Sequence, residues 1–319
     1  MFNLLKASHL FCFCVCILYL SVSSASARER FVDVKMLFPD QSVKRCGHSS
    51  ESLTLKRDEP VTVIVHGCRS SAGQFKALAQ VYEHLGEQTV CFEYDDRQSL
   101  DTVSGQLIDA LNALSPIAGD ERIIVLGHSQ GGLIARRAHT QHRQDQKVLT
   151  HSHIDIATIS APFNGIDASS HCGIGWLRIA SLGLVDAICY LVTGPKYLDI
   201  PPQSDFIVQP GALAPQVYSH LVVKTDETET CRTYSSSGQC IEDDYVFSLV
   251  EQTKLKIETS PRITSVVVDA GHVEIVGNDT NIPWKLISVL QENRLMKMPE
   301  EAEFESFAQA VRKIYQSFI

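Results

Sequence analysis

Residues 122–139 constrain the fold of this chain more than any other segment. They begin with RIIVLG, which is typical of a buried strand, and end with LIARRAH, which has helical character. Between these runs lies GHSQGG, residues 127–132, in which glycines enclose Ser129. Glycine on both sides of Ser129 permits a sharp turn in which Cβ atoms would otherwise clash. The segment therefore predicts a strand, a tight turn with Ser129 at its apex, and a helix.

Strand-like and helix-like segments alternate through most of the chain. Apolar, β-branched runs predict strands at residues 61–65, 89–92, 122–127, 154–160, 217–224 and 262–269. Apolar residues at steps of three and four predict helices at residues 73–85, 100–114, 131–139, 283–290 and 299–319. Such alternation is typical of βαβ units, in which helices cover both faces of a mostly parallel sheet. The expected fold class is α/β.

Residues 164–216 break this alternation. They are rich in glycine, proline and apolar residues, and they contain one apolar helix candidate at residues 174–192. A segment this long without regular structure is uncommon as a loop inside a compact domain. We therefore expect residues 164–216 to be an inserted cap or lid on a single domain that spans residues 28–319.

The N-terminal residues have the pattern of a secretory signal. Lys6 precedes a very apolar run at residues 10–20, and the small residues Ala25-Ser26-Ala27 follow. This pattern predicts a signal peptide at residues 1–27 that is cleaved before Arg28. An uncleaved membrane anchor is the alternative, but the apolar core is short against the roughly 20 residues that span a bilayer. We expect an exported protein, whether secreted, periplasmic or lumenal.

The chain has ten cysteines, three of which lie in the predicted signal, so seven remain in the mature protein. Export favours disulfides, and an odd number leaves at least one thiol over. Cys231 and Cys240 flank a polar loop that contains glycine, so they are the first expected pair. Cys172 with Cys189 is the second. The alternative is that several of the seven are buried free thiols.

The composition gives no support to several function classes. The formal net charge is −9 and no basic stripe is present, which argues against nucleic-acid binding. No cysteine or histidine spacing suggests a zinc site. Four histidines in a polar connection lack a carboxylate arranged with them for a metal, so we expect surface residues at His139, His142, His151 and His153. We expect neither a metal nor a cofactor.

Ser129 is the expected nucleophile. A strand before a Gly-x-Ser-x-Gly motif and a helix after it are the context that a nucleophile elbow requires. A serine hydroxyl also needs a general base that a carboxylate orients, in the chain order serine, acid, histidine. His272 follows the last predicted strand and is the only histidine beyond His220, so we expect it to be the base.

The acid is expected near the end of the segment Glu242-Asp243-Asp244. Asp244 directly precedes an apolar pair that could anchor it, so it is the preferred candidate. Asp243 is the next candidate. Asp226 and Glu242 are less favoured, and at least two of the three consecutive acids are expected to be solvated loop residues.

A tetrahedral intermediate needs two backbone N–H groups that bind its oxyanion. One is expected from Gln130, immediately after the nucleophile. The other is expected from Cys68, in the loop that follows the first predicted strand, and its thiol has no part in that role. We expect His66 and His128 to be structural.

With these residues in place, the chain resembles the α/β-hydrolase superfamily, and within it the lipase and esterase branch. The matching segments run from residue 61 to about residue 290 and are VTVIVHGCRSS, VLGHSQGGLIARRA, IATISAPFNG, EDDYVFS and DAGHVEIV. The resemblance implies a triad of Ser129, Asp244 and His272, with Cys68 and Gln130 as the oxyanion hole.

Two features depart from that branch. The loop after His66-Gly67 is less rich in glycine than the loop of many lipases. Gln130 follows the nucleophile, as it also does in palmitoyl-protein thioesterases, which are similar in fold and also exported. These departures leave the substrate less defined than the chemistry.

The resemblance implies a serine hydrolase that cleaves carboxylic esters of lipid-like acyl groups through an acyl-enzyme. The apolar part of the lid would cover an acyl pocket and contact a membrane surface transiently when open. Two alternatives stay open: an acyl thioesterase similar to the palmitoyl-protein thioesterases, and a non-catalytic binding protein on the same fold. An intact order of serine, acid and histidine argues against the second alternative.

Overall fold

The structure, a computed structural model, describes residues 30–47, 52–68, 70–141, 143–173, 194–278 and 281–317. Three sequence predictions involve residues outside these ranges: the signal peptide at residues 1–27, the apolar helix at residues 174–192, and the pair of Cys172 with Cys189. Within the ranges, no helix is both long and apolar enough to cross a membrane.

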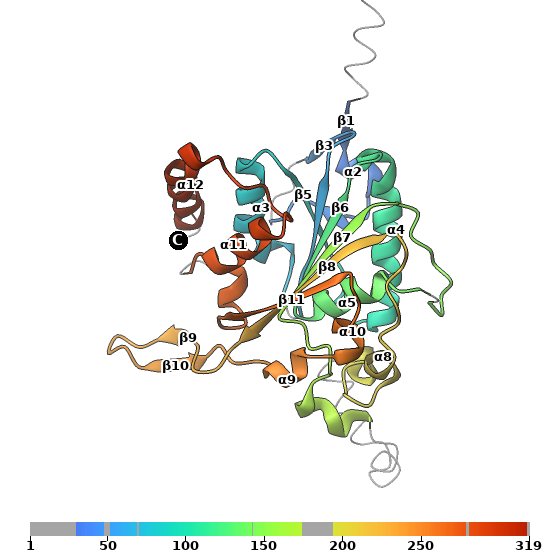
Figure 1. The fold of residues 1–319 in the computed structure, drawn as a ribbon, viewed down its shortest axis with the longest axis vertical. Helices are drawn as coiled ribbons and strands as arrows, with labels where there is room; N and C mark the ends of the chain where they lie inside the picture. Colours follow the sequence, from blue (N-terminus) through green and yellow to red (C-terminus); the bar gives the residue numbers. More distant parts are fainter. Residues whose placement is uncertain are drawn as a thin grey trace, which may run out of the picture.

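A seven-stranded sheet forms the centre of the molecule (Figure 1). Its strand order is β11-β8-β7-β6-β4-β5-β2, and neighbouring strands are parallel except for β5 and β2. The strands are β2 (Val43–Lys44), β4 (Val61–Val65), β5 (Gln88–Phe92), β6 (Ile123–His128), β7 (Ile154–Ile159), β8 (Val217–Asp226) and β11 (Ile263–Asp269). Every residue of β4, β6 and β7 is buried, because the sheet is covered on both faces.

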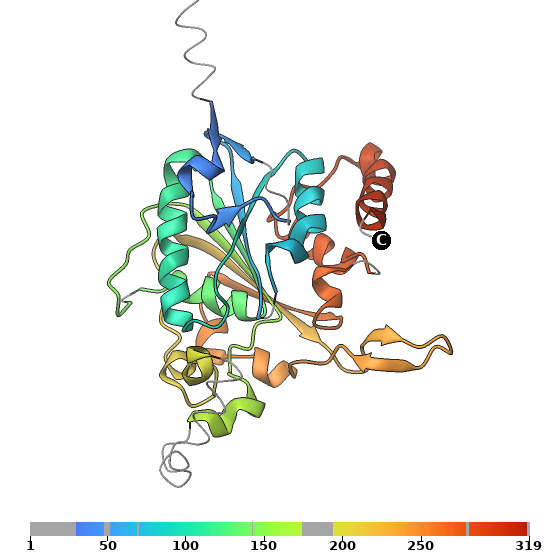
Figure 2. The same cartoon turned by 180° about the vertical axis from the view of Figure 1, so that it is seen from behind.

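Helices cover both faces of this sheet (Figures 1 and 2). One face packs against α4 (Leu100–Ala118) and α5 (Gln130–Ala138). The other face packs against α3 (Lys76–His84), α11 (Trp284–Glu292) and α12 (Phe304–Gln316). Each face has its own apolar cluster, so the core consists of two layers separated by the sheet. The predicted α/β class is confirmed.

The loops that follow the parallel strands meet at one edge of the sheet. Since β4, β6, β7, β8 and β11 run in the same direction, the residues after each strand lie along its carboxyl edge. Open α/β sheets bind their ligands at this edge. Three short helices lie near it: α8 (Asp205–Val208), α9 (Leu249–Gln252) and α10 (Leu255–Glu258) (Figure 1).

Residues 160–216 join β7 to β8. The described parts of this connection contain only short elements, namely η2 (Asp167–Gly173), η3 (Pro195–Leu198) and α8. The connection adds no strand to the sheet in the described ranges, in agreement with the break in the sequence pattern. Its role as a lid stays a prediction.

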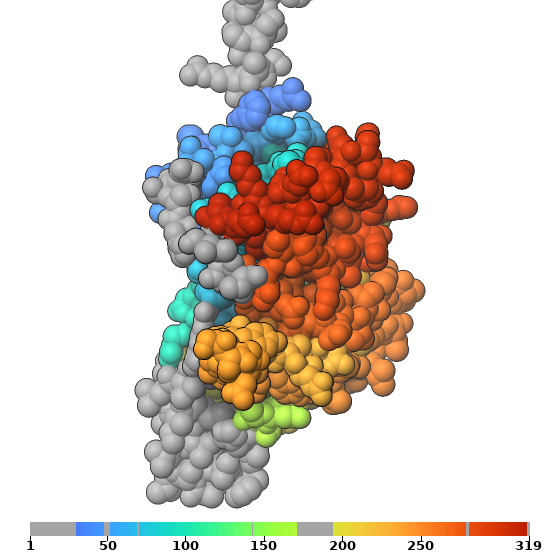
Figure 3. All heavy atoms as spheres, turned by 90° about the vertical axis from the view of Figure 1, so that its left-hand side faces the viewer, coloured from blue at the N-terminus to red at the C-terminus, as the bar shows by residue number. Residues whose placement is uncertain are grey.

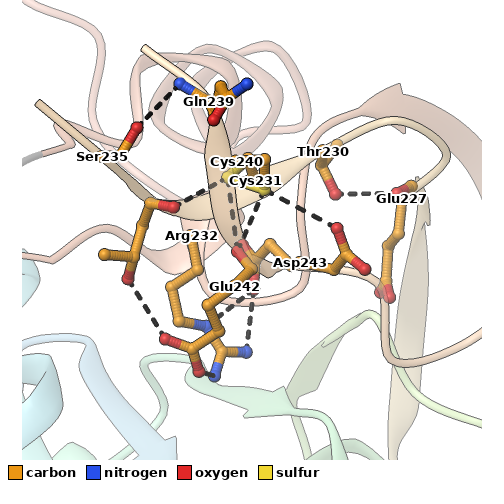
Figure 4. Close-up of a disulfide and its surroundings, with 11 residues drawn as sticks. Glu227, Thr230, Cys231, Arg232, Ser235, Gln239, Cys240, Glu242 and Asp243 are labelled. Carbon is orange, nitrogen blue, oxygen red and sulfur yellow. Dashed lines mark hydrogen bonds and ion pairs between the residues drawn. A yellow bond between two sulfur atoms is a disulfide. The ribbon is translucent and has the colours of Figure 1, made fainter. Parts of the chain in front are cut away.

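A small hairpin projects from the body between β8 and α9 (Figures 1 and 2). It consists of β9 (Cys231–Tyr234) and β10 (Cys240–Asp243), and Figure 3 shows its atoms at the surface of the face below the C-terminal helices. A disulfide between Cys231 and Cys240 closes it, as Figure 4 shows, which confirms the first predicted pair. A second two-stranded sheet pairs β1 (Phe31–Asp33) with β3 (Thr54–Lys56), with α2 (Val34–Leu37) between them.

A second disulfide joins Cys46 to Cys91. It was not predicted, because it depends on the antiparallel register that places Lys44 opposite Cys91. Cys68 carries a free thiol. Two disulfides in the described part of the chain indicate an oxidising environment.

Candidate active site

Ser129 occupies a sharp turn between β6 and α5. Its φ of 55° and ψ of −123° are in a region that residues with a side chain rarely adopt, at a cost of about 1–3 kcal/mol. The glycines make this turn possible. A Cβ on Gly127 would lie 2.4 Å from the carbonyl oxygen of Gly131, and one on Gly131 would lie 2.3 Å from that of Val65. The predicted strand, turn and helix are all present.

The loop after β4 passes directly beside Ser129. A Cβ on Gly67 would lie 3.1 Å from the Cβ of Ser129. Cys68 is the next residue after Gly67, so its backbone N–H lies near Ser129. Gln130 is the first residue of α5, and the first N–H groups of a helix have no acceptor within the helix. The two predicted oxyanion donors therefore lie in the loop after β4 and at the first residue of α5.

His272 follows β11 and lies at the same edge of the sheet. Its Nδ1 is 3.0 Å from Oε1 of Glu227, which is buried at the end of β8. Burial raises the pKa of the Glu227 carboxyl, but the interaction with His272 and the backbone hydrogen bonds from Phe247 and Val246 together outweigh burial, and the pKa lies below its usual value. Glu227 is thus an ionised carboxylate that holds the imidazole through Nδ1 and leaves Nε2 available.

Four further donors hold Glu227 in place. The hydroxyls of Ser160 and Thr225 donate to its Oε1, both at 2.8 Å. The backbone N–H groups of Val246 and Phe247 donate to its Oε2, at 2.5 and 2.8 Å. A buried carboxylate with this many donors keeps both its charge and its orientation.

The structure places Asp244, the predicted acid, elsewhere. Its carboxylate accepts hydrogen bonds from the backbone N–H groups of Val273, at 3.0 Å, and Glu274, at 2.9 Å. Its own carbonyl accepts from the N–H of His272 at 3.0 Å. Asp244 therefore binds the main chain of the histidine loop and not the ring, which corrects the sequence-based assignment.

An arginine of the disulfide-closed hairpin pairs with Asp244 from outside. Arg232 donates from Nη2 to Oδ1 of Asp244 at 2.9 Å and from Nη1 to Glu242 at 3.1 Å, and its side chain reaches back from the hairpin in Figure 4. Asp243, the second candidate for the acid, is exposed on β10. Asp244 also packs closely against the loop that precedes His272, because a Cβ on Gly271 would lie 2.2 Å from Oδ2 of Asp244. Asp244 thus shapes the backbone around His272.

Glu227 could have been found from the sequence. It is the first residue after β8, at the carboxyl end where a triad acid belongs, but β8 extends to Asp226 and the predicted strand ended at Lys224. Because the predicted strand was two residues too short, Glu227 was assigned to a loop and not to the end of a strand.

Ser160 is a second residue that the sequence reasoning missed. It directly follows β7 and has a φ of 47° although it is not glycine. Its hydroxyl oxygen lies 2.8 Å from Nδ1 of His272 and 2.8 Å from Oε1 of Glu227. The Ser160 hydroxyl is therefore within hydrogen-bonding distance of both the carboxylate of Glu227 and the imidazole of His272.

His128 ties the nucleophile turn to the histidine loop. Burial lowers the pKa of His128 to about 3, so the ring is neutral, and its Nε2–H donates to the carbonyl of His272 at 2.9 Å. The rings of Phe247 and His272 also pack together at nearly a right angle, with centroids 4.9 Å apart and an interplanar angle of 87°. These contacts fix His272 next to the residue that precedes Ser129.

Within the described residues, no hydrogen bond joins the Ser129 hydroxyl to His272. Such catalytic bonds are often long in the absence of substrate and tighten in its presence.

His66 is buried in the loop after β4, where burial lowers its pKa, and its Nδ1 lies 2.9 Å from the carbonyl of Gly67. This contact is consistent with the structural role expected of His66.

Two of the histidines considered for a metal are buried and bound to other groups. His139 is fully buried at the end of α5, with Nδ1 2.6 Å from the carbonyl of Ala135, and burial lowers its pKa to about 4. His151 is also buried and bonds to the carbonyl of Glu121. The expectation of surface residues was therefore wrong for these two, because packing against α4 and α5 covers them, while His142 lies outside the described residues.

The sequence matches no protein-family model and no curated protein. Among solved structures, the Bacillus licheniformis lipase BlEst2 in its propeptide form gives a TM-score of 0.50 at 12% identity, over 78% of this chain and 52% of that one. Its mature form gives 0.45 at 13% identity, over 80% of this chain and 98% of that one. A Listeria innocua gene product gives 0.48 at 14% identity, over 76% and 96%. The chain thus spans about half of the propeptide form.

The strand order, the two helical layers and the likeness to the propeptide-form lipase together decide the fold. The protein has the α/β-hydrolase fold. In this fold the reactive residues follow one another as serine, acid and histidine, and Ser129, Glu227 and His272 lie in that order at the carboxyl edge. Because identities this low carry only the fold, the function has to be argued from the site itself.

Proposed function

We propose that the protein is an exported serine hydrolase that cleaves carboxylic esters of lipid-like acyl groups. One observation carries the proposal: Glu227 holds the imidazole of His272 by Nδ1, at 3.0 Å, at the edge where Ser129 stands in a strained turn. A serine at the apex of a sharp turn, a buried carboxylate and a histidine, in this chain order, serve one chemistry, nucleophilic acyl transfer.

In the proposed mechanism, Nε2 of His272 accepts the proton of Ser129 while the hydroxyl oxygen attacks the acyl carbonyl. Glu227 stabilises the imidazolium that forms, since its carboxylate is ionised and hydrogen-bonded to Nδ1. The N–H groups of Cys68 and Gln130 bind the oxyanion. His272 then gives its proton to the leaving alcohol, and an acyl-enzyme remains on Ser129.

Water completes the cycle. His272 takes a proton from the water, which attacks the acyl carbonyl, and returns the proton to Ser129 as the acid leaves. No metal or cofactor has a step in this sequence, because the nucleophile, base and oxyanion donors all come from the chain.

The surface near the site supports a lipid-like substrate. Val250 of α9 and Leu255 of α10 are 68% and 74% exposed, and Val208 at the end of α8 is 39% exposed. The helices α8, α9 and α10 lie at the same edge of the sheet as the site (Figure 1). We infer that they, with the lid at residues 164–216, make transient contact with a membrane or lipid surface.

Two features support export. The signal pattern at residues 1–27 predicts translocation and cleavage. The two disulfides form in the oxidising compartments that such a signal leads to. We therefore place the mature enzyme, residues 28–319, outside the cytosol.

An acyl thioesterase is the second candidate, and Gln130 favours it. The same residue follows the nucleophile in the thioesterases that the elbow resembles, and here its side chain is buried and hydrogen-bonded at the site. The mechanism is unchanged, with a thiol leaving in place of an alcohol. Substrate comparison separates the two.

The test is hydrolysis of p-nitrophenyl esters with acyl chains of 2 to about 16 carbons, alongside a long-chain acyl thioester of coenzyme A. The mature protein is compared with Ser129→Ala and with Ser306→Ala, which removes an exposed serine of α12. We expect activity in the mature protein and in Ser306→Ala, a rise towards long acyl chains, and loss in Ser129→Ala. Labelling by a fluorophosphonate should follow the same pattern.

Each outcome has a distinct meaning. Faster turnover of the thioester than of every ester would replace the esterase by the thioesterase. If all three proteins are inactive on every substrate and none is labelled, the catalytic proposal fails and a binding protein on this fold takes its place.

A further inference from the structure

One lysine is buried beside the nucleophile turn. Lys196 lies in η3, in the connection between β7 and β8, and is 3% exposed. Lysine is almost never fully buried unless its ammonium group is paired. Here Nζ donates to Oε1 of Gln130 at 2.8 Å, to the carbonyl of Asp96 at 2.7 Å and to Sγ of Cys68 at 3.0 Å.

These three acceptors come from three different segments at the carboxyl edge. Cys68 follows β4, Asp96 follows β5 and Gln130 follows β6. The side chain of Gln130 also binds the loop after β5, because its Nε2 donates to the carbonyl of Asp96 at 3.1 Å. A single ammonium group thus joins the loops after β4 and β5 to the residue that directly follows Ser129.

Two of the three contacted residues are those whose backbone N–H groups form the proposed oxyanion hole. The side chains of Cys68 and Gln130 both accept a hydrogen bond from Nζ of Lys196, although the three residues lie far apart in the sequence. A carboxylate oxygen of Asp96 lies 3.8 Å from Nζ and offsets part of the positive charge. Lys196 is therefore placed to set the orientation of both donors.

We propose that Lys196 is a positioning residue of the oxyanion hole, supplied by the connection between β7 and β8. The inference rests on the proposed function. Oxyanion donors act only if they already point to where charge develops in the transition state, and loss of one donor lowers kcat about 10²–10³-fold. Because the bound substrate carries no oxyanion and the charge develops only in the transition state, Lys196 affects kcat and leaves KM nearly unchanged.

The connection has other anchors, which allow this role to be separated from simple docking. Asp199 accepts the N–H of Leu100 through Oδ2 at 2.7 Å. Lys254 donates to Oδ1 of Asn164 at 3.0 Å, at the start of the same connection. Neither contact reaches Cys68 or Gln130.

The experiment compares Lys196→Met with two controls, Lys254→Met and Asp199→Ala, in the mature protein. Methionine keeps the length of the lysine stem and removes the charge and the donors. With a p-nitrophenyl ester as substrate, we expect kcat to fall about tenfold to a hundredfold in Lys196→Met while KM stays within about twofold. Both controls should keep kcat within about threefold of the unmodified protein.

A second readout uses a trifluoromethyl ketone that forms an anionic tetrahedral adduct on Ser129. Its affinity should weaken in Lys196→Met by the same factor as kcat/KM, because the adduct oxygen lies in the oxyanion hole. If Lys196→Met does not fold, Gln130→Met removes the contact from the other side and keeps the backbone donor. It should also lower kcat at unchanged KM.

The inference and the proposed function can fail separately. A mature protein without Ser129-dependent activity would end the proposed function. If that activity is present and Lys196→Met keeps kcat within twofold, Lys196 has no role in the oxyanion hole. Equal losses in Lys196→Met and Asp199→Ala, with KM raised in both, would show that Lys196 only holds the connection in place.

Discussion

The comparison of Glu227→Gln with Asp244→Asn tests the assignment of the acid most directly. In Glu227→Gln, the amide oxygen and the NH2 group must share the positions of Oε1 and Oε2. Oε2 receives two backbone N–H groups, from Val246 and Phe247, which cannot turn round. The amide oxygen must therefore take the Oε2 position, because an NH2 group there would oppose two donors.

The NH2 group then faces Nδ1 of His272 in place of Oε1. An NH2 group can only donate, so Nδ1 becomes an acceptor and the imidazole carries its proton on Nε2. In that tautomer His272 cannot accept the proton of Ser129. An Asp-to-Asn change of this kind in a serine protease triad lowers kcat about 10⁴-fold, and we expect a loss of about 10³–10⁴-fold here.

Asp244→Asn should behave differently. The asparagine oxygen can take the position of Oδ2 of Asp244 and still accept a backbone N–H of the histidine loop. The ion pair with Arg232 is lost. Hydrogen bonds to a charged group contribute about 1.5–3 kcal/mol, so the free energy of unfolding should fall by about that amount. We expect kcat to fall less than about tenfold, since the ring of His272 keeps its carboxylate partner.

Initial rates with p-nitrophenyl butyrate and urea unfolding curves measure both effects. Glu227→Gln should remain folded at assay temperature, so that its lost activity reports the tautomer. The reasoning is refuted if Asp244→Asn loses 10³-fold or more in kcat with unchanged stability while Glu227→Gln stays within tenfold.

Three further predictions follow from the site and the disulfides. Ser160→Ala removes the hydroxyl between the acid and His272, so kcat should fall about tenfold, with a shifted pH–rate profile and little change in KM. Replacing Cys46 and Cys91 by alanine opens a loop with a sequence separation of 45, and urea unfolding should show a loss of about 4 kcal/mol. Burial raises the pKa of Asp199 to about 6, against about 3.9 when unfolded, so its ionisation lowers stability as the pH rises through this window. Asp199→Asn should therefore raise the melting temperature more at pH 8 than at pH 4.5, and an equal rise at both would contradict the shift.

The sequence by itself determined the parts of this protein that depend on local pattern. Glycines around Ser129, a strand before it and a helix after it specify the turn within a dozen residues, because only glycine tolerates that backbone approach. Apolar spacing predicted the strands and helices of the sheet in the same way. His272 also followed from position, since it comes directly after the last strand.

Only the tertiary structure decided which carboxylate meets the imidazole. The parallel register of β8 and β11 sets Asp226 opposite Asp269, so that Glu227 and His272 leave the sheet side by side. After Glu227 the chain forms the hairpin of β9 and β10, and Asp244 then binds the backbone of the loop that contains His272.

The same reason applies to the Cys46–Cys91 disulfide and to Lys196. Both depend on residues that are distant in the sequence and are brought together by strand register and loop packing. Local pattern specifies a turn, a strand or a helix, because those interactions span only a few residues. The partner of a side chain at the edge of a parallel sheet is decided by packing across the whole fold.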